Sequence, residues 1–162
     1  MRTTLVADPA FPTSQPYNTA PWNYPGPESN ASPPATTTDW MLVQLRTGTD
    51  SATAVASVAA LLLEDGSIVD ASGSGPVQLA VAPGSYYVVL YHRNHLPVIT
   101  ASAVDFASGA ASYDFTTAMS QALGATPMIG LGAGGSAPFA LWGADGNGDG
   151  LVTAPDFNLY SA

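Results

Sequence analysis

The chain contains no cysteine and no lysine, and both absences restrict its chemistry. Without cysteine it has neither disulfide bonds nor a thiol nucleophile. Without lysine it cannot form a Schiff base, nor the lysine–asparagine isopeptide crosslink that stabilises some pilus domains. Its stability must therefore come from packing, from a bound ion or from neighbouring subunits in an assembly.

Charge is also scarce and mostly negative. Only 9% of the residues are charged, and Arg2, Arg46 and Arg93 are the only cationic side chains in a chain of net charge −9. Such a chain cannot neutralise phosphate groups, so we expect no nucleic-acid partner, and an anionic membrane surface would repel it. The length of 162 residues and the 46% hydrophobic content suffice for one domain with a real core.

Long apolar segments are missing as well. Residues 54–63 form the longest apolar run, which Ser57 interrupts and which is too short to span a bilayer, so we expect no membrane insertion. Residues 1–10 contain no hydrophobic signal segment, because Asp8 and Pro9 interrupt them. We expect the chain to be a processed or partial piece of an exported precursor.

The clearest pattern that is present is a calcium-loop spacing at residues 145–156. Oxygen-bearing side chains occupy positions one, three, five, nine and twelve, and Gly150 stands at position six, where the loop must turn sharply. Calcium takes about six to eight hard oxygen ligands in proteins. The predicted ligands are the side chains of Asp145, Asn147, Asp149 and Asp156, the carbonyl group of Leu151, and Thr153 directly or through water.

The loop differs from a helix–loop–helix calcium site on both sides. Position twelve is Asp156 and not the longer Glu, and residues 139–142 before the loop have the pattern of a strand. A short helix is expected after it, with a capping box from Thr153 to Asp156 and Pro155 in the tolerated first turn. The alternative is a metal-free turn, since Asp, Asn and Gly dominate turns, but the number of matching positions favours calcium. The helix is expected to make apolar contacts through Phe157, Leu159 and Tyr160.

A calcium loop of this kind points to the outside of the cell, where calcium is abundant. Asn30 begins an Asn-Ala-Ser sequon, and residues 36–38 are three threonines that could carry O-linked sugars. We therefore expect an extracellular or cell-surface location, with Asn30 as the candidate glycosylation site.

Residues 1–38 combine many prolines with aromatic side chains. Proline excludes helices and central strands, and a solvated linker has little use for aromatic residues. We therefore predict an extended arm that packs either on its own domain or on the next subunit. The candidate residues of this assembly arm are Tyr17, Trp22 and Tyr24.

Residues 39–142 carry the pattern of a β domain. Asp65-Gly66 between two apolar runs predicts a hairpin, and residues 117–123, before Gly124, predict one helical turn. Strands are expected at residues 40–46, 54–64, 67–70, 77–81, 85–92, 96–104, 111–115 and 139–142. This pattern predicts an all-β fold, an Ig-like or transthyretin-like two-sheet β-sandwich. Residues 143–162 would follow it as a dockerin-like calcium loop and short helix.

His92 and His95 are the only histidines. A zinc site needs three or four converging ligands, and residues three apart on a strand point to opposite faces. Both could therefore bind one ion only if a turn lies between them, and we favour histidines that hydrogen-bond neighbouring loops. No nucleophile-elbow sequence surrounds any serine, and residues 132–135 lack the lysine of a phosphate loop, so we predict no enzyme activity.

Four stretches, residues 15–24, 39–46, 83–89 and 92–96, together resemble a known module. They are similar to a module of large secreted surface proteins of Bacteroidetes-type bacteria, often labelled haemagglutinin-like, which ends in a dockerin-type calcium loop like residues 145–156. The resemblance covers nearly the whole chain. It implies a calcium-bearing extracellular β domain that is not an enzyme.

The chain departs from that family at both ends. In the family a further strand precedes the residues that match 1–5, and dockerin-type regions usually carry a second calcium loop or further chain. A sandwich that lacks a strand exposes a sheet edge, which the arm of a neighbour could fill by strand addition. Repeated head-to-tail, this contact builds an open filament of copies of the chain. The leading hypothesis is therefore a structural, calcium-stabilised extracellular subunit that assembles by strand or arm exchange. The alternative is a cell-surface adhesin or dockerin-like binding module that recognises a glycan or a partner domain.

Overall fold

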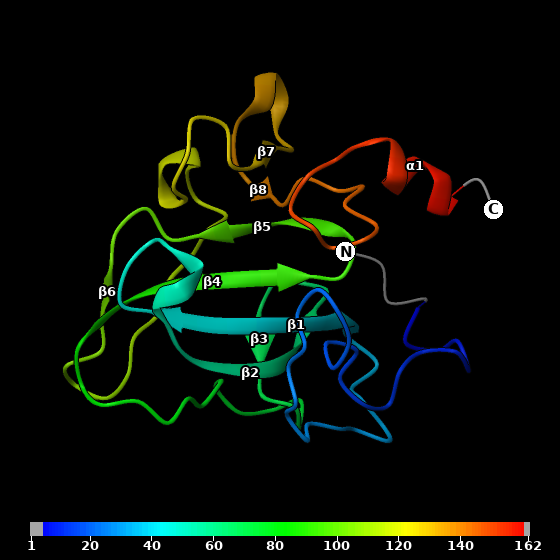
Figure 1. The fold of residues 1–162 in the computed structure, drawn as a ribbon, viewed down its shortest axis with the longest axis horizontal. Helices are drawn as coiled ribbons and strands as arrows, with labels where there is room; N and C mark the ends of the chain where they lie inside the picture. The colour runs from blue at the N-terminus through cyan, green and yellow to red at the C-terminus, as the bar shows by residue number, and fades with distance from the viewer. Residues whose placement is uncertain (1–4, 161–162) are drawn as a thin grey trace. The chain divides into compact units, whose positions relative to one another are not determined.

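The computed structural model describes residues 5–160, and most of its regular structure is β-strand (Figure 1). The strands are β1 (Thr37–Arg46), β2 (Ala54–Leu63), β3 (Ile68–Val69), β4 (Ser85–His92), β5 (His95–Ile99), β6 (Val104–Asp105), β7 (Ile129–Gly130) and β8 (Phe139–Ala140). The helical elements are the 3₁₀ turns η1 (Ser51–Thr53), η2 (Met119–Gln121) and η3 (Ala133–Gly135) and the helix α1 (Ala154–Tyr160). The predicted all-β class with one short C-terminal helix is thus confirmed.

The chain divides into two compact units. The first comprises the residues up to 43 together with residues 57–80, and the second comprises residues 44–56 and those from 81 onward. The strands β1 and β2 each continue from one unit into the other. Within residues 5–160 no helix is both long enough and apolar enough to cross a membrane.

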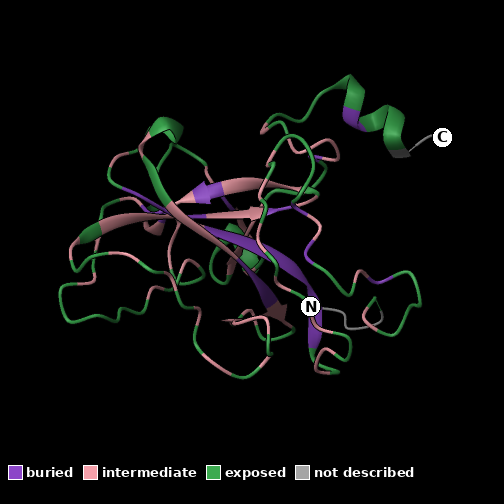
Figure 2. Cartoon of the chain, turned by 60° about the horizontal axis from the view of Figure 1, so that its bottom comes forward, coloured by how far each residue is buried: buried purple, intermediate pink, exposed green. Residues whose placement is uncertain are grey.

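In the first unit, β3, β2 and β1 are neighbours in that order. The β2–β3 hairpin is antiparallel, with Leu61 opposite Val69, and it turns at Asp65-Gly66 as predicted. Gly66 has a φ of 93°, and Asp65 Oδ1 accepts a hydrogen bond from the N–H of Ser67 at 2.9 Å. Nearly every residue of β1 is buried, which explains its continuous apolar sequence (Figure 2).

The proline-rich arm packs on the first unit of its own chain. The side chain of Tyr17 is fully buried, and its hydroxyl donates to the backbone carbonyl of Trp40 at 2.8 Å. The indole N–H of Trp40 in turn donates to the carbonyl of Pro12 at 2.8 Å. The ring of Trp22 packs edge-on against Tyr17, with centroids 5.1 Å apart. Of the two predicted arrangements of the arm, this structure therefore has the intrachain one.

In the second unit, β4 pairs antiparallel with β5 and with β6. The bounds of β4 match the predicted strand, because its aromatic and β-branched residues lie between turn residues. β7 and β8 form a separate two-stranded sheet. The core of this unit gathers around Val98, Ala122 and Met128, with Leu90 and Leu141 packed against it.

Three predicted strands were wrong in whole or in part. Residues 77–81 alternate between exposed and half-buried, as expected for a strand, but they have no strand partner, and residues 111–115 have none either. The predicted strand at 96–104 is interrupted and becomes β5 and β6. Alternation of side chains marks an extended backbone, whereas a strand also needs a partner edge for its N–H and C=O groups. The expectation that a strand is missing before residues 1–5 concerns residues that, apart from Leu5, lie outside the described part of the chain.

Candidate metal centre

The candidate calcium loop, residues 145–156, lies in the second unit, after β8, and its last three residues form the start of α1. Its start is fastened to β5, because the N–H of Leu96 donates to the carbonyl of Trp142 at 2.8 Å and His95 pairs with Gly143 in an antiparallel bridge. The predicted strand at 139–142 ends at residue 140. The two residues that lead into the loop, Trp142 and Gly143, are thus held against β5.

Gly150 adopts the conformation that the loop spacing requires. Its φ is 83°, in the left-handed region that favours glycine, and a Cβ placed there would meet no atom within 4 Å. The position therefore needs glycine for its backbone angle and not for lack of space. Ala144, immediately before the loop, also has a positive φ of 79°, which is costly for a residue with a side chain.

Asp145 is the most informative residue of the loop. Its side chain is 1% exposed, and Oδ2 accepts a hydrogen bond from the N–H of Gly150 at 3.0 Å. The other carboxylate oxygen, Oδ1, is buried without a hydrogen-bond partner. The pKa of Asp145 is raised, chiefly by burial and to a smaller extent by the charges of Asp149 and Asp156, although the backbone N–H groups of Gly150 and Gly148 lower it in part. A buried carboxylate oxygen without a partner is unfavourable unless a cation compensates it.

Asp156, at position twelve, ties the two ends of the loop together. It is 1% exposed and accepts hydrogen bonds from the backbone N–H groups of Thr153 at 2.7 Å, Gly146 at 3.0 Å and Asn147 at 3.2 Å. These bonds, led by that of Thr153, lower the pKa of Asp156. The carboxylate therefore remains ionised inside the loop.

Asn147 and Asp149 shape the turns between these ends. Asn147 Oδ1 accepts from the N–H of Asp149 at 3.0 Å, and Asp149 Oδ1 accepts from the N–H of Leu151 at 2.9 Å. The Asn147 amide also donates to Asp149 Oδ2 at 2.9 Å. Both side chains thus hold the backbone in successive Asx turns. Leu151, the predicted carbonyl ligand, is 61% exposed, and Thr153 is exposed as well.

The predicted ligands therefore share one loop but do not form a closed shell. Across the described residues, no three His, Cys, Asp or Glu side chains converge closely enough to hold a metal ion. Most of the side-chain oxygen atoms of the loop take part in hydrogen bonds, whereas Asp145 Oδ1 is buried without a partner. The donor set nevertheless fits Ca²⁺, because it consists of oxygen atoms and includes three carboxylates.

The helix after the loop begins as predicted but packs differently. Thr153 N–H donates to Asp156, which is one half of a capping box, and Pro155 lies in the first turn of α1. The expected apolar contacts of Phe157 and Leu159 are wrong, because these side chains are 71% and 58% exposed. A helix of two turns can bury only one face, and here Asp156 takes the buried position (Figure 2). The side chain of Tyr160 lies outside the described residues.

The other predicted site residues lie in the first unit. The Asn30 amide, the candidate glycan attachment group, donates to the carbonyls of Ala71 at 2.9 Å and Ser72 at 3.3 Å. The hydroxyl of Tyr24 donates to Glu28 Oε1 at 2.6 Å. The pKa of Tyr24 is raised, mainly by burial and next by this hydrogen bond to the Glu28 carboxylate. The three aromatic arm residues are thus engaged within their own unit.

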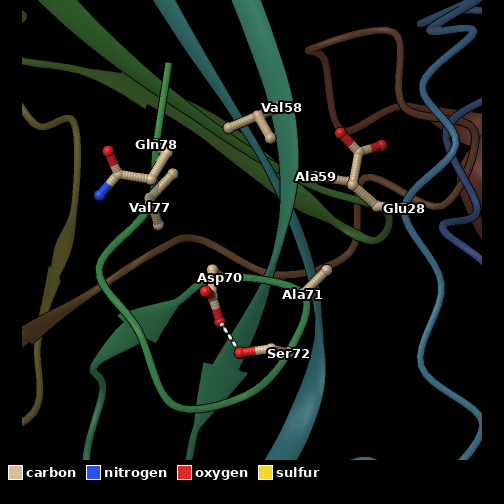
Figure 3. Close-up of a pocket in the computed structure, with 8 residues that line it drawn as sticks. All are labelled: Glu28, Val58, Ala59, Asp70, Ala71, Ser72, Val77 and Gln78. Carbon is tan, nitrogen blue, oxygen red and sulfur yellow. Dashed lines mark hydrogen bonds between the residues drawn. The ribbon is translucent and has the colours of Figure 1, made fainter. Parts of the chain in front are cut away.

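The first unit also contains a pocket that sequence analysis did not anticipate (Figure 3). It has a volume of about 280 Å³, and Glu28 from the arm and Asp70 from after β3 both line it. Glu28 Oε2 is buried without a hydrogen-bond partner, whereas Asp70 Oδ1 accepts from the Ser72 hydroxyl at 2.5 Å. No local pattern links residues 28 and 70, so only the fold could bring them to one pocket.

The arrangement of residues 145–156 can present ionised oxygen atoms to a hard cation, and nothing in it provides a nucleophile paired with a base. The loop offers one uncompensated buried oxygen, at Asp145, and a backbone already held in the shape of a turn. No protein-family model matches the chain, and no curated protein or solved structure matches it either.

Proposed function

We propose that this chain is a structural extracellular protein whose residues 145–156 bind Ca²⁺. The single observation that carries the proposal is Asp145 Oδ1, a buried carboxylate oxygen with no hydrogen-bond partner. Two further carboxylates, Asp149 and Asp156, belong to the same loop. A cation within this loop would offset the cost of burying the Asp145 charge.

Calcium suits the loop better than magnesium or a transition metal. The candidate donors are oxygen atoms, which excludes ions that prefer nitrogen or sulfur. Magnesium demands a near-ideal octahedron and retains several waters, whereas calcium accepts irregular shells of carboxylate, amide and carbonyl oxygens. The spacing of the loop, with Gly150 at the turn, matches the calcium pattern.

The proposed role of the ion is to stabilise a subunit that assembles with copies of itself. Without cysteine or lysine, the chain has no covalent crosslink of either common kind. We envisage an Ig-like or transthyretin-like sandwich that joins head-to-tail into a filament by arm or strand exchange. In the exchanged form, the contact of Tyr17 with the Trp40 carbonyl would be made between subunits. The likeness to haemagglutinin-like surface modules supports the extracellular location.

A surface binding module is the second candidate, and one observation favours it. Four apolar side chains within the loop and on the helix are 52–71% exposed. They are Leu151, Val152, Phe157 and Leu159. A partner domain that covered these side chains would make the chain an adhesin or dockerin-like module.

The calcium proposal is tested by titrating Ca²⁺ into the chain by calorimetry and by measuring its unfolding with and without chelator. We expect one ion to bind, with Kd within about 10⁻⁴–10⁻³ M, as in other extracellular modules. Calcium at about 100 times Kd would stabilise the folded chain by about 2.7 kcal/mol. Asp145→Asn should abolish this gain, yet in chelator it should be at least as stable as the wild type, because it removes an uncompensated buried charge.

Asp65→Asn is the matched control, since Asp65 holds a turn far from the loop in sequence. It should retain the full calcium response. The proposal fails if the wild type shows no response to millimolar Ca²⁺, or if Asp145→Asn responds like the wild type.

A further inference from the structure

The hairpin between β4 and β5 brings the two histidines of the chain together. His92 is the last residue of β4, His95 is the first of β5, and their Cα atoms are register partners. A two-residue turn, Arg93-Asn94, lies between them, which is the condition under which both rings can reach one ion. The rings meet edge to face, with centroids 4.5 Å apart and an interplanar angle of 87°.

Three polar atoms converge at this turn. His92 Nδ1 lies 3.0 Å from His95 Nδ1, and Asn94 Oδ1 lies 2.6 Å from His95 Nδ1. The N–H of Asn94 donates to His92 Nδ1 at 3.4 Å, so that nitrogen acts as an acceptor. The contact between the two rings then requires a proton on His95 Nδ1, shared with Asn94 Oδ1. Two nitrogens and one oxygen thus surround a single proton.

We propose that His92 and His95, with Asn94, bind a divalent transition-metal ion that prefers tetragonal coordination, Cu²⁺ or Ni²⁺. The ion takes the position next to His95 Nδ1 that the shared proton occupies, and the neutral His95 ring then carries its single proton on Nε2. Two nitrogens that each lie about 2.0–2.1 Å from a metal are about 2.9 Å apart at a right angle and about 3.4 Å apart at the tetrahedral angle. The distance of 3.0 Å between the Nδ1 atoms therefore matches the tetragonal geometry of Cu²⁺ and Ni²⁺ better than tetrahedral zinc.

The fold holds these donors in place. His92 is 7% exposed at the end of β4, and the bridge between His95 and Gly143 fixes the backbone of the second histidine. Gly143 lies against His95 Nε2, where a Cβ would be 3.7 Å away, so the opposite nitrogen, Nδ1, is directed to His92. Asn94 is exposed, which leaves the remaining coordination positions to water.

Charge supports the binding of a cation at this turn. The chain has a net charge of −9, which raises the local concentration of any divalent cation. Arg93 lies within the turn and opposes binding by its own charge, so an ion must gain its affinity from the two imidazoles. The site is separate in chemistry from the calcium loop, because nitrogen ligands select transition metals and oxygen ligands select calcium.

The test is a titration of the full chain with Cu²⁺ in excess Ca²⁺, followed by calorimetry and electron paramagnetic resonance. The chain has two histidines, no cysteine and no lysine, so imidazole nitrogen couplings can arise only from His92 and His95. We expect one equivalent of Cu²⁺ bound, with couplings from two imidazole nitrogens. His95→Gln should remove one nitrogen coupling and lower the affinity for Cu²⁺ roughly 100-fold. Loss of a group that only orients a metal ligand already lowers metal affinity by about 10–100-fold, and loss of a ligand itself should cost at least as much.

Asn94→Ala keeps the proposal testable if His95→Gln does not fold, because Asn94 is exposed and the change leaves both histidines in place. It should lower the affinity roughly 10-fold. Asn18→Ala, at an exposed asparagine of the arm, is the control and should bind Cu²⁺ like the wild type. Adventitious binding only, weaker than millimolar, overturns the proposal. So does a Cu²⁺ spectrum with oxygen ligands alone, or unchanged affinity in His95→Gln and Asn94→Ala.

Discussion

Single residues in this chain act mainly by satisfying backbone N–H groups. Asp70 is the clearest case outside the loop. Its Oδ1 accepts from the Ser72 hydroxyl at 2.5 Å and from the N–H groups of Gly73 at 3.1 Å and Gly75 at 3.2 Å. The Ser72 hydroxyl first, and then the backbone donors, lower the pKa of Asp70. One carboxylate thus orders the turn that follows β3.

This lowered pKa makes stability depend on pH in a defined direction. The folded carboxyl holds its proton less tightly than the unfolded one, whose pKa is about 3.9, so the stabilisation is fully present above about pH 4. It is lost as the pH falls from there through the lower folded pKa. We expect the stability difference between the wild type and Asp70→Asn, measured by urea unfolding, to shrink as the pH falls from about 5 to about 2. A difference that stays constant over this range would show that the Asp70 carboxylate is not preferentially ionised in the folded state.

At the scale of elements, Tyr17 is the most deeply buried aromatic residue that holds the arm. Tyr17 is fully buried and its hydroxyl donates to the Trp40 carbonyl, so the arm is fixed to β1 by packing and by a hydrogen bond. This contact joins residues that are 23 apart in the sequence. An extended segment without strand pairing can therefore be as firmly placed as a strand.

Substitutions at Tyr17 separate the two contributions. Tyr17→Phe should lower the free energy of unfolding by about 1–3 kcal/mol, since it leaves the buried Trp40 carbonyl without its donor. Tyr17→Ala should cost about 3–5 kcal/mol through the cavity it creates. Both are measured by urea unfolding. Tyr86→Phe is the control, because its hydrogen bond to the Ala82 carbonyl is exposed, and it should change stability by less than about 0.5 kcal/mol. If Tyr17→Phe were as harmless as the control, the arm would not be docked in solution.

At the scale of the whole molecule, the net negative charge opposes self-assembly. A net charge of −9 makes copies of the chain repel one another, and each bound Ca²⁺ would reduce that repulsion as well as stiffen the C-terminal loop. If the subunits form the proposed filament, we therefore expect that filament to depend on bound Ca²⁺. This dependence distinguishes the proposed structural role from a monomeric binding module.

Negative-stain electron microscopy of native material, with calcium and after excess chelator, tests the assembly. We expect regular filaments that fray or dissolve when calcium is removed, because residues 145–156 then lose the ion proposed to stiffen them. Adding calcium back should restore the filaments. Magnesium added at the same concentration is the control and should not restore them. Monodisperse particles in both conditions would contradict the filament proposal and favour the binding module.

Local signals in the sequence were sufficient for several elements. The Asp65-Gly66 hairpin, the bounds of β4 and the helix after the loop all depend on neighbouring residues, so their patterns predicted them. Residues 77–81 show the limit of such signals, since they have the alternation of a strand without its partner. Pairing depends on which edge the rest of the chain presents, and no short pattern contains that information.

The sequence by itself determined the all-β class, the absence of disulfide and lysine crosslinks and the spacing of the candidate calcium loop. Only the tertiary structure decided that Asp145 Oδ1 is buried without a partner, that Tyr17 docks on its own chain, and that the two histidines meet across one turn. The physical reason is that burial and convergence are properties of atoms brought together from distant parts of the chain. Spacing along the chain specifies which groups are available, and packing specifies which of them face one another.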